Sequence, residues 1–121
     1  MTEADALTRL RTACLSLPEA MEQEAWGEPT FRVRNKIFAM YAGAGNHHGQ
    51  GRAAVWCSAG LGVQELLVRS DPETYFVPPY VGVKGWIGID IDRIGDADLR
   101  SHVVESYCRI APKKLAKLVE E

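Results

Sequence analysis

The stretch Thr30-Phe-Arg-Val-Arg-Asn-Lys-Ile-Phe-Ala-Met-Tyr41 decides the fold that we expect for this chain. Apolar and basic residues alternate from Phe31 to Arg34, and an apolar run from Ile37 to Tyr41 follows Asn35-Lys36, so we interpret the stretch as a β-hairpin that turns at these two residues. A two-residue turn there sets Val33 opposite Phe38. Side chains alternate between the two faces of a strand, so this register predicts one apolar face, formed by Phe31, Val33, Phe38 and Met40. The other face is basic and aromatic, and carries Thr30, Arg32, Arg34, Ile37, Ala39 and Tyr41.

Segments on either side of the hairpin predict helices and further strands. An amphipathic helix begins after Thr2, a suitable N-cap, and ends near Ser16 before Pro18. A first strand is expected within residues 19–28, and a second after the hairpin at 53–58, where Trp56 faces away from its neighbours Val55 and Cys57. Later elements are a helix at 61–69, a strand at 86–92, a helix capped by Asp96 and a short helix from Pro112.

This order of elements predicts an α+β two-layer sandwich. The strands form an antiparallel sheet, each strand has one apolar face, and the helices cover that face of the sheet. The other face then meets solvent or a partner. With 121 residues, the chain suits a single domain over residues 1–121.

Composition limits the classes of function. The formal net charge is −2, which argues against a strong non-specific binder of polyanions but permits a local basic patch. The cysteines, Cys14, Cys57 and Cys108, are widely spaced and lack a CxxC motif, so we interpret them as buried thiols of a reduced, cytoplasmic protein. Neither a signal peptide nor a membrane-spanning segment is visible in the sequence.

Several short motifs resemble the MmcQ/YjbR family. They are Leu17-Pro18, Trp26-Gly-Glu-Pro-Thr-Phe31, Lys36 with Phe38-Ala39, Gly85-Trp-Ile87 and Ser106-Tyr107, and they follow one another between Leu15 and Leu118. The resemblance implies a compact fold related to the frataxin (CyaY-like) sandwich and a bacterial cytoplasmic protein. Members of the family are commonly labelled DNA-binding, and no enzymatic activity defines it.

The basic hairpin face is the first candidate site. Guanidinium groups can hold phosphates in a bidentate manner, and aromatic rings offer stacking surfaces for bases. The residues that we assign to a nucleic-acid-binding face are Arg32, Arg34, Lys36, Tyr41, Lys84 and Trp86. Asp90 and Asp92 share a strand face with Trp86, so cross-strand pairing with the arginines is the competing interpretation.

Other classes of function stay open. A groove between the glycine-rich loop at 43–51, Trp26 and Trp86 can hold a small molecule, and the apolar stretch Tyr75–Tyr80 can contact a protein partner. The acidic segment 19–28 invites a comparison with iron-binding frataxins, and His47-His48 is the obvious pair of metal ligands. No catalytic constellation is visible, and Cys57 can act as a nucleophile only with a histidine in contact with it in the fold. We therefore expect a monomer or weak homodimer without cofactor, metal or catalysis.

Overall fold

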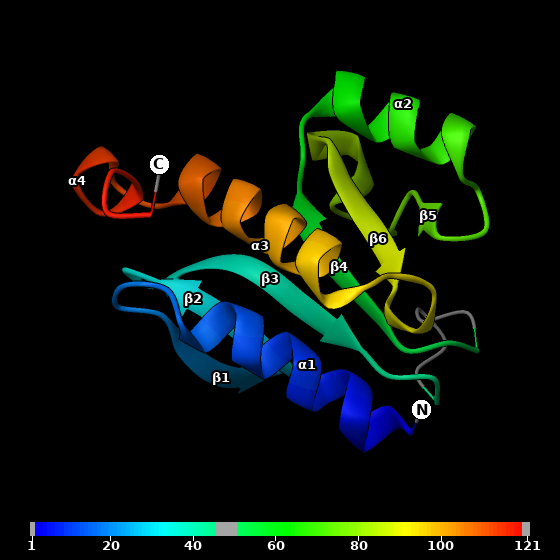
Figure 1. The fold of residues 1–121 in the computed structure, drawn as a ribbon, viewed down its shortest axis with the longest axis horizontal. Coiled ribbons are helices and arrows are strands. Elements are labelled where there is room, and N and C mark those ends of the chain that lie inside the picture. The colour runs from blue at the N-terminus through cyan, green and yellow to red at the C-terminus, as the bar shows by residue number, and fades with distance from the viewer. Residues whose placement is uncertain (1, 46–50, 120–121) are drawn as a thin grey trace.

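The computed structural model describes residues 2–45 and 51–119, which form one six-stranded antiparallel sheet and its covering helices (Figure 1). The strands are β1 (Met21–Ala25), β2 (Glu28–Val33), β3 (Lys36–Ala42), β4 (Ala54–Ser58), β5 (Tyr75–Phe76) and β6 (Trp86–Asp90). The helices are α1 (Glu3–Leu15), α2 (Leu61–Ser70), α3 (Asp96–Ile110) and α4 (Lys113–Ala116); the 3-10 helices η2 (Gly82–Lys84) and η3 (Ile91–Arg93) flank β6. The strand order is β1-β2-β3-β4-β6-β5.

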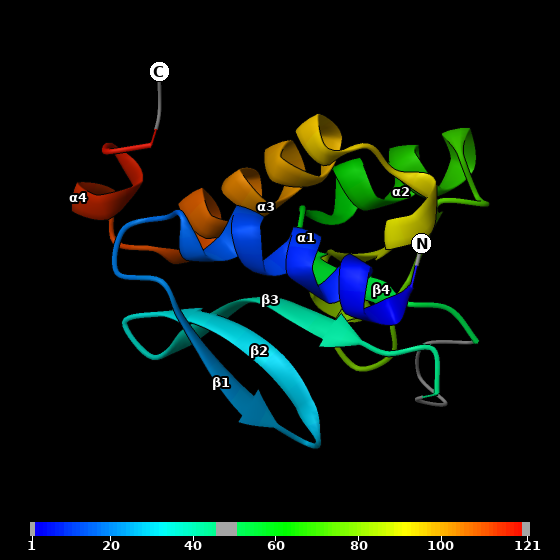
Figure 2. The same ribbon diagram turned by 60° about the horizontal axis from the view of Figure 1, so that its bottom comes forward.

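Helices α1 and α3 pack side by side on one face of the sheet (Figures 1 and 2). The main core lies between these two layers and includes Leu10, Val55, Ile87, Ile89 and Val103, all fully buried. The two-layer α+β sandwich expected from the sequence is confirmed. None of the helices in residues 2–45 and 51–119 has the length and apolar character needed to cross a bilayer.

The hairpin forms, but its turn lies one residue earlier than predicted. Val33 pairs with Lys36, so the two turn residues are Arg34 and Asn35, with φ of 50° and 66°. Both therefore adopt the left-handed conformation that a tight hairpin turn requires at its two central positions. The predicted turn at Asn35-Lys36 was wrong. It required the left-handed conformation at Asn35 and Lys36, whereas the two left-handed residues are Arg34 and Asn35.

A β-bulge then restores part of the expected pattern. Arg32 pairs with Ile37 but Phe31 pairs with Ala39, so Phe38 is an extra residue in β3. Phe38 still packs in the main core with Phe31 and Val33, as predicted. Beyond the bulge the alternation is reversed. Tyr41 packs in the main core, and Met40 lies with Ile37 on the opposite face. The predicted faces of Tyr41 and Met40 were therefore wrong.

Two boundaries near the end of the sheet also differ from the prediction. Strand β6 ends at Asp90, because Asp90 caps η3 by accepting a hydrogen bond from the Asp92 backbone N–H. Asp92 therefore does not lie on the strand. Gly95, not Asp96, occupies the N-cap position of α3, and Asp96 is its first helical residue.

Candidate functional site

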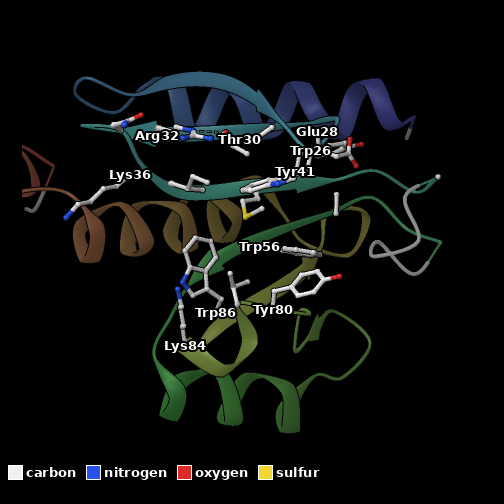
Figure 3. A pocket seen from close by; sticks show the side chains of 17 residues that line it. Trp26, Glu28, Thr30, Arg32, Lys36, Tyr41, Trp56, Tyr80, Lys84 and Trp86 are labelled. Carbon is white, nitrogen blue, oxygen red and sulfur yellow. Dashed lines mark hydrogen bonds between the residues drawn. The ribbon is translucent and has the colours of Figure 1, made fainter.

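A groove of about 990 Å³ opens on the sheet face opposite α1 and α3 (Figure 3). One wall comes from the β1–β2 turn, β2 and the hairpin, and the other from β4, β6 and the segment that precedes β6. Figure 3 shows Thr30 and Arg32 on the first wall and Trp56, Trp86 and Tyr80 on the second. The groove lies where the sequence predicts the free face of the sheet.

A second, smaller apolar cluster forms the base of the groove and the lower part of its second wall. Trp56 on β4 lies beside Met40 on β3 and Gly88 on β6, which are its cross-strand partners. Trp56 and Trp86 are only 5% and 8% exposed, so each presents little of its ring to the groove. Trp86, which we expected to be an open stacking platform, is thus chiefly a packing residue.

Three cations line the hairpin half of this groove. Arg32 lies opposite Ile37, Lys36 begins β3, and Lys84 ends η2, two residues before Trp86. Figure 3 shows Lys36, Lys84 and Trp86 at the same end of the site. Within residues 2–45 and 51–119, no carboxylate lies at ion-pair distance from Arg32, Lys36 or Lys84. Their positive charge is therefore directed to solvent and to any bound ligand.

The opposite end of the groove is aromatic. Trp26, in the turn between β1 and β2, is 78% exposed, and Tyr80 on the other wall is 74% exposed. Glu28 also lines this end, where its Oε2 accepts a hydrogen bond from the Gly43 backbone N–H at 2.6 Å. The groove thus has a cationic end and an aromatic end, which we call the hairpin end and the turn end.

Helix α2 holds the cationic end in place through a buried amide. Gln64 is the buried residue of α2, and its Nε2 donates to the backbone carbonyls of Gly82 at 2.8 Å and Trp86 at 2.7 Å. These two carbonyls flank Lys84. One side chain therefore satisfies two buried acceptors and fixes the path of the chain that presents Lys84.

Besides Trp86, two more of the predicted site residues, Arg34 and Tyr41, do not contribute to the groove as expected. Arg34 lies outside it and forms a bidentate pair with Glu19, whose pKa this guanidinium lowers. Tyr41 borders the groove, but its ring packs in the main core and its hydroxyl donates to Glu3 Oε1 at 3.0 Å. Burial is the main cause that raises the pKa of Tyr41. Sequence reasoning placed Tyr41 on the groove face because it did not include the bulge.

Asp90 and Asp92 do not form the cross-strand pairs with the hairpin arginines that the competing interpretation required. The Asp90 carboxylate lies 3.6 Å from Arg52, and it also caps η3. Asp92 lies in η3, beyond the end of β6. The pairing of these two aspartates with the hairpin arginines is therefore not found; the carboxylate that neutralises a hairpin arginine is Glu19.

The acidic segment 19–28 does not assemble into a metal centre in the described residues. Glu19 binds Arg34, Glu22 forms a bidentate pair with Arg11, and Glu28 binds the Gly43 backbone. The described part of the chain contains no group of three or more His, Cys, Asp or Glu side chains placed to hold a metal ion. His47 and His48 lie outside the described residues.

Cys57 is fully buried and His102 is partly buried, and neither is placed for catalysis in the groove. Burial raises the pKa of the Cys57 thiol to about 12, so the nucleophilic thiolate is not populated at neutral pH. His102 on α3 lies 2.8 Å from the Tyr75 hydroxyl on β5, at Nε2. Neither residue lines the groove.

Comparison with known proteins identifies the family but no activity. The family model named YjbR matches residues 15–109. Among solved structures, the Deinococcus radiodurans protein DR2400, with the family-model domain DUF419, is similar with a TM-score of 0.71 and 16% sequence identity, covering 85% of this chain and 76% of that one. At this identity, the likeness concerns the fold alone. No curated protein matches the sequence.

Proposed function

The chain belongs to the YjbR family, and we propose that it is a non-catalytic protein that binds single-stranded nucleic acid in the groove described above. The observation that carries this proposal is that Arg32, Lys36 and Lys84 line the hairpin half of an aromatic groove, and that none of them has a carboxylate at ion-pair distance in the described residues. Cationic side chains that track a backbone, beside rings on which bases stack, are the usual means of holding a single strand.

The shape of the site favours a single strand over a duplex. The cations and the exposed rings line a concave groove, whereas readers of the major groove of DNA insert a projecting helix or β-ribbon. Bases in a duplex are stacked on one another, whereas an unpaired base can stack on the exposed faces of Trp26 and Tyr80. A formal net charge of −2 adds little attraction outside the groove.

The chemistry of the lining favours binding over catalysis. In the described residues, the groove is lined by no histidine, cysteine or serine. Its carboxylate, Glu28, accepts a hydrogen bond from the Gly43 backbone N–H, and the Thr30 hydroxyl donates to the Gln23 carbonyl at 2.6 Å. A catalytic site needs a nucleophile or a base in reach of a partner that activates it. We therefore assign the groove a binding role.

A small anionic molecule with an aromatic body is the second candidate ligand. A volume of about 990 Å³ lies at the upper end of the range typical of small-molecule sites, which are largely apolar with a few placed polar groups. Ile37, Met40 and Val81 supply that apolar lining. A free nucleotide carries the same anionic and planar groups as a strand, so an experiment must separate the two sources.

The test is fluorescence anisotropy with a labelled single strand and the corresponding duplex, each titrated at two salt concentrations. We expect the single strand to bind more tightly, with a slope of log K against log salt near −2 if three phosphates are contacted. Displacement of the strand by a free mononucleotide at comparable concentration would favour the small-molecule candidate. Absence of binding by either labelled DNA at low salt would overturn the proposal of nucleic-acid binding.

A further inference from the structure

Two aromatic residues at the turn end of the groove hold backbone conformations that aromatic side chains rarely adopt. Trp26 has φ of 54° and Tyr80 has φ of 65°, both in the left-handed region. Trp26 and Gly27 are the two central residues of the β1–β2 turn, because Ala25 pairs with Glu28. Glycine, asparagine and aspartate are the residues that such turns prefer. A tryptophan at this position costs free energy that asparagine would save.

Folding does not recover that cost through burial of the rings. The apolar stabilisation of a side chain scales with the area that it removes from water, and these two residues stay 78% and 74% exposed. Strained conformations of this kind concentrate at ligand-binding sites, where the strain serves function. The two residues come from separate segments of the chain, yet both line the same groove.

Their placement relative to the cations gives the groove a direction. Trp26 lies on the wall that carries Thr30 and Arg32, and Tyr80 lies on the wall that carries Trp56 and Trp86 (Figure 3). Lys36 and Lys84 lie at the other end. A ligand that satisfies both ends has an anionic group at one end and an exposed planar ring at the other.

We propose that Trp26 and Tyr80 are the ring-binding residues of this groove, and that they stack on a planar base while its phosphate lies at the hairpin end. This inference rests on the proposed function and adds to it the part of the ligand that each end recognises. It assigns the affinity for bases to the two exposed rings and not to the buried rings of Trp56 and Trp86.

Asparagine is the substitution that tests this assignment. Trp26→Asn and Tyr80→Asn remove the rings and leave residues that tolerate a positive φ, so the turns are kept. Arg34→Asn is the matched control, because Arg34 also has a positive φ but lies outside the groove. The probes are a labelled oligothymidylate and an abasic strand of the same length, which keeps the phosphates and lacks the bases.

We expect Trp26→Asn and Tyr80→Asn each to weaken binding of oligothymidylate by about tenfold, which is within the usual contribution of one stacked base. Binding of the abasic strand should be unchanged by either variant and weaker than that of oligothymidylate for the wild type. Arg34→Asn should bind both strands as the wild type does. Melting temperatures of the two groove variants at or above that of the wild type would show that the loss is not due to unfolding.

The outcomes separate this inference from the proposed function. If the wild type binds neither strand, both proposals are wrong. If Arg32→Ala weakens the binding of oligothymidylate while Trp26→Asn and Tyr80→Asn bind it as tightly as the wild type, the groove binds the strand but the ring assignment is wrong. Equal affinity of the wild type for the abasic and intact strands would also overturn the ring assignment.

Discussion

Arg34 and Glu19 face each other across a bidentate ion pair, with Nε 2.6 Å from Oε1 and Nη2 3.1 Å from Oε2. Arg32, two residues earlier in the same hairpin, instead directs Nε to the Thr30 hydroxyl at 3.1 Å and lines the groove. The two arginines thus share a chain segment and a charge but differ in position and in counter-charge. Substitution of Arg32 therefore tests the groove as a binding site, and substitution of Arg34 is the matched control.

Arg32→Ala should weaken binding of a single strand and lower the salt dependence, whereas Arg34→Ala should do neither. Each lost phosphate contact is expected to reduce the slope of log K against log salt by about 0.7 for a single strand. The carboxylate of Glu19 already compensates the charge of Arg34, so that residue has little to offer a phosphate. Anisotropy titrations of both variants over a salt series measure the difference. Equal losses in the two variants would indicate non-specific attraction.

The faces of the later strands were predictable because period-two alternation is undisturbed there. Val55 and Cys57 point into the main core and Trp56 points away, as the sequence indicates, and Ile87 and Ile89 behave in the same way. Each of these side chains is almost fully buried on its own side. A shift of one residue would exchange the faces, so the pattern of apolar residues fixes the register.

The hairpin face was only partly predictable because a bulge carries no clear sequence signal. The inserted Phe38 reverses the alternation for the residues that follow it, and this decides the side on which Met40 and Tyr41 lie. Placement of Lys84 and Tyr80 on the wall that faces the hairpin depends on long-range packing through Gln64 and the segment before β6. Contacts between segments so far apart in the chain do not follow from local periodicity.

Ser106 on α3 connects the helix layer to the bulge and to β4. Its Oγ is fully buried, donates to the Phe38 carbonyl at 2.6 Å and accepts from the Ser58 backbone N–H at 2.8 Å. Ser106→Ala leaves both backbone groups without this partner, so we expect a loss of about 1–3 kcal/mol in the free energy of unfolding. Urea denaturation measures it. Ser70→Ala, at an exposed hydroxyl of α2, is the control and should change stability by less than about 0.5 kcal/mol.

Gly88 on β6 makes room for the Phe76 ring, which belongs to the second apolar cluster. A Cβ at Gly88 would lie 2.3 Å from two ring carbons of Phe76, which is far inside van der Waals contact. Gly88→Ala should therefore destabilise the protein by about 1–3 kcal/mol through overpacking. Gly62 in α2 has no neighbour within 4 Å of such a Cβ, so Gly62→Ala should stabilise by up to about 1 kcal/mol. Thermal unfolding that showed the same change for both glycines would contradict this account of Gly88.

The partial burial of His102 should make stability depend on pH. Burial is the main cause that lowers the pKa of His102, against the opposing effect of Asp98 and Glu105. The unfolded state, with a histidine pKa of about 6.5, therefore binds the proton more readily than the folded state. The His102 contribution to stability is complete above that value and is lost as the pH falls below it towards the lowered pKa of the folded state.

Urea denaturation at a series of pH values from about 8 to about 5 measures this loss as a fall in the free energy of unfolding. His102→Gln keeps a polar side chain near the Tyr75 hydroxyl but does not titrate, so the variant should lose less stability than the wild type over the same range. The difference between the two curves isolates His102 from the carboxylates that both proteins share. Parallel curves would show that His102 has the same proton affinity in the folded and unfolded states, and would contradict the effect assigned to its burial.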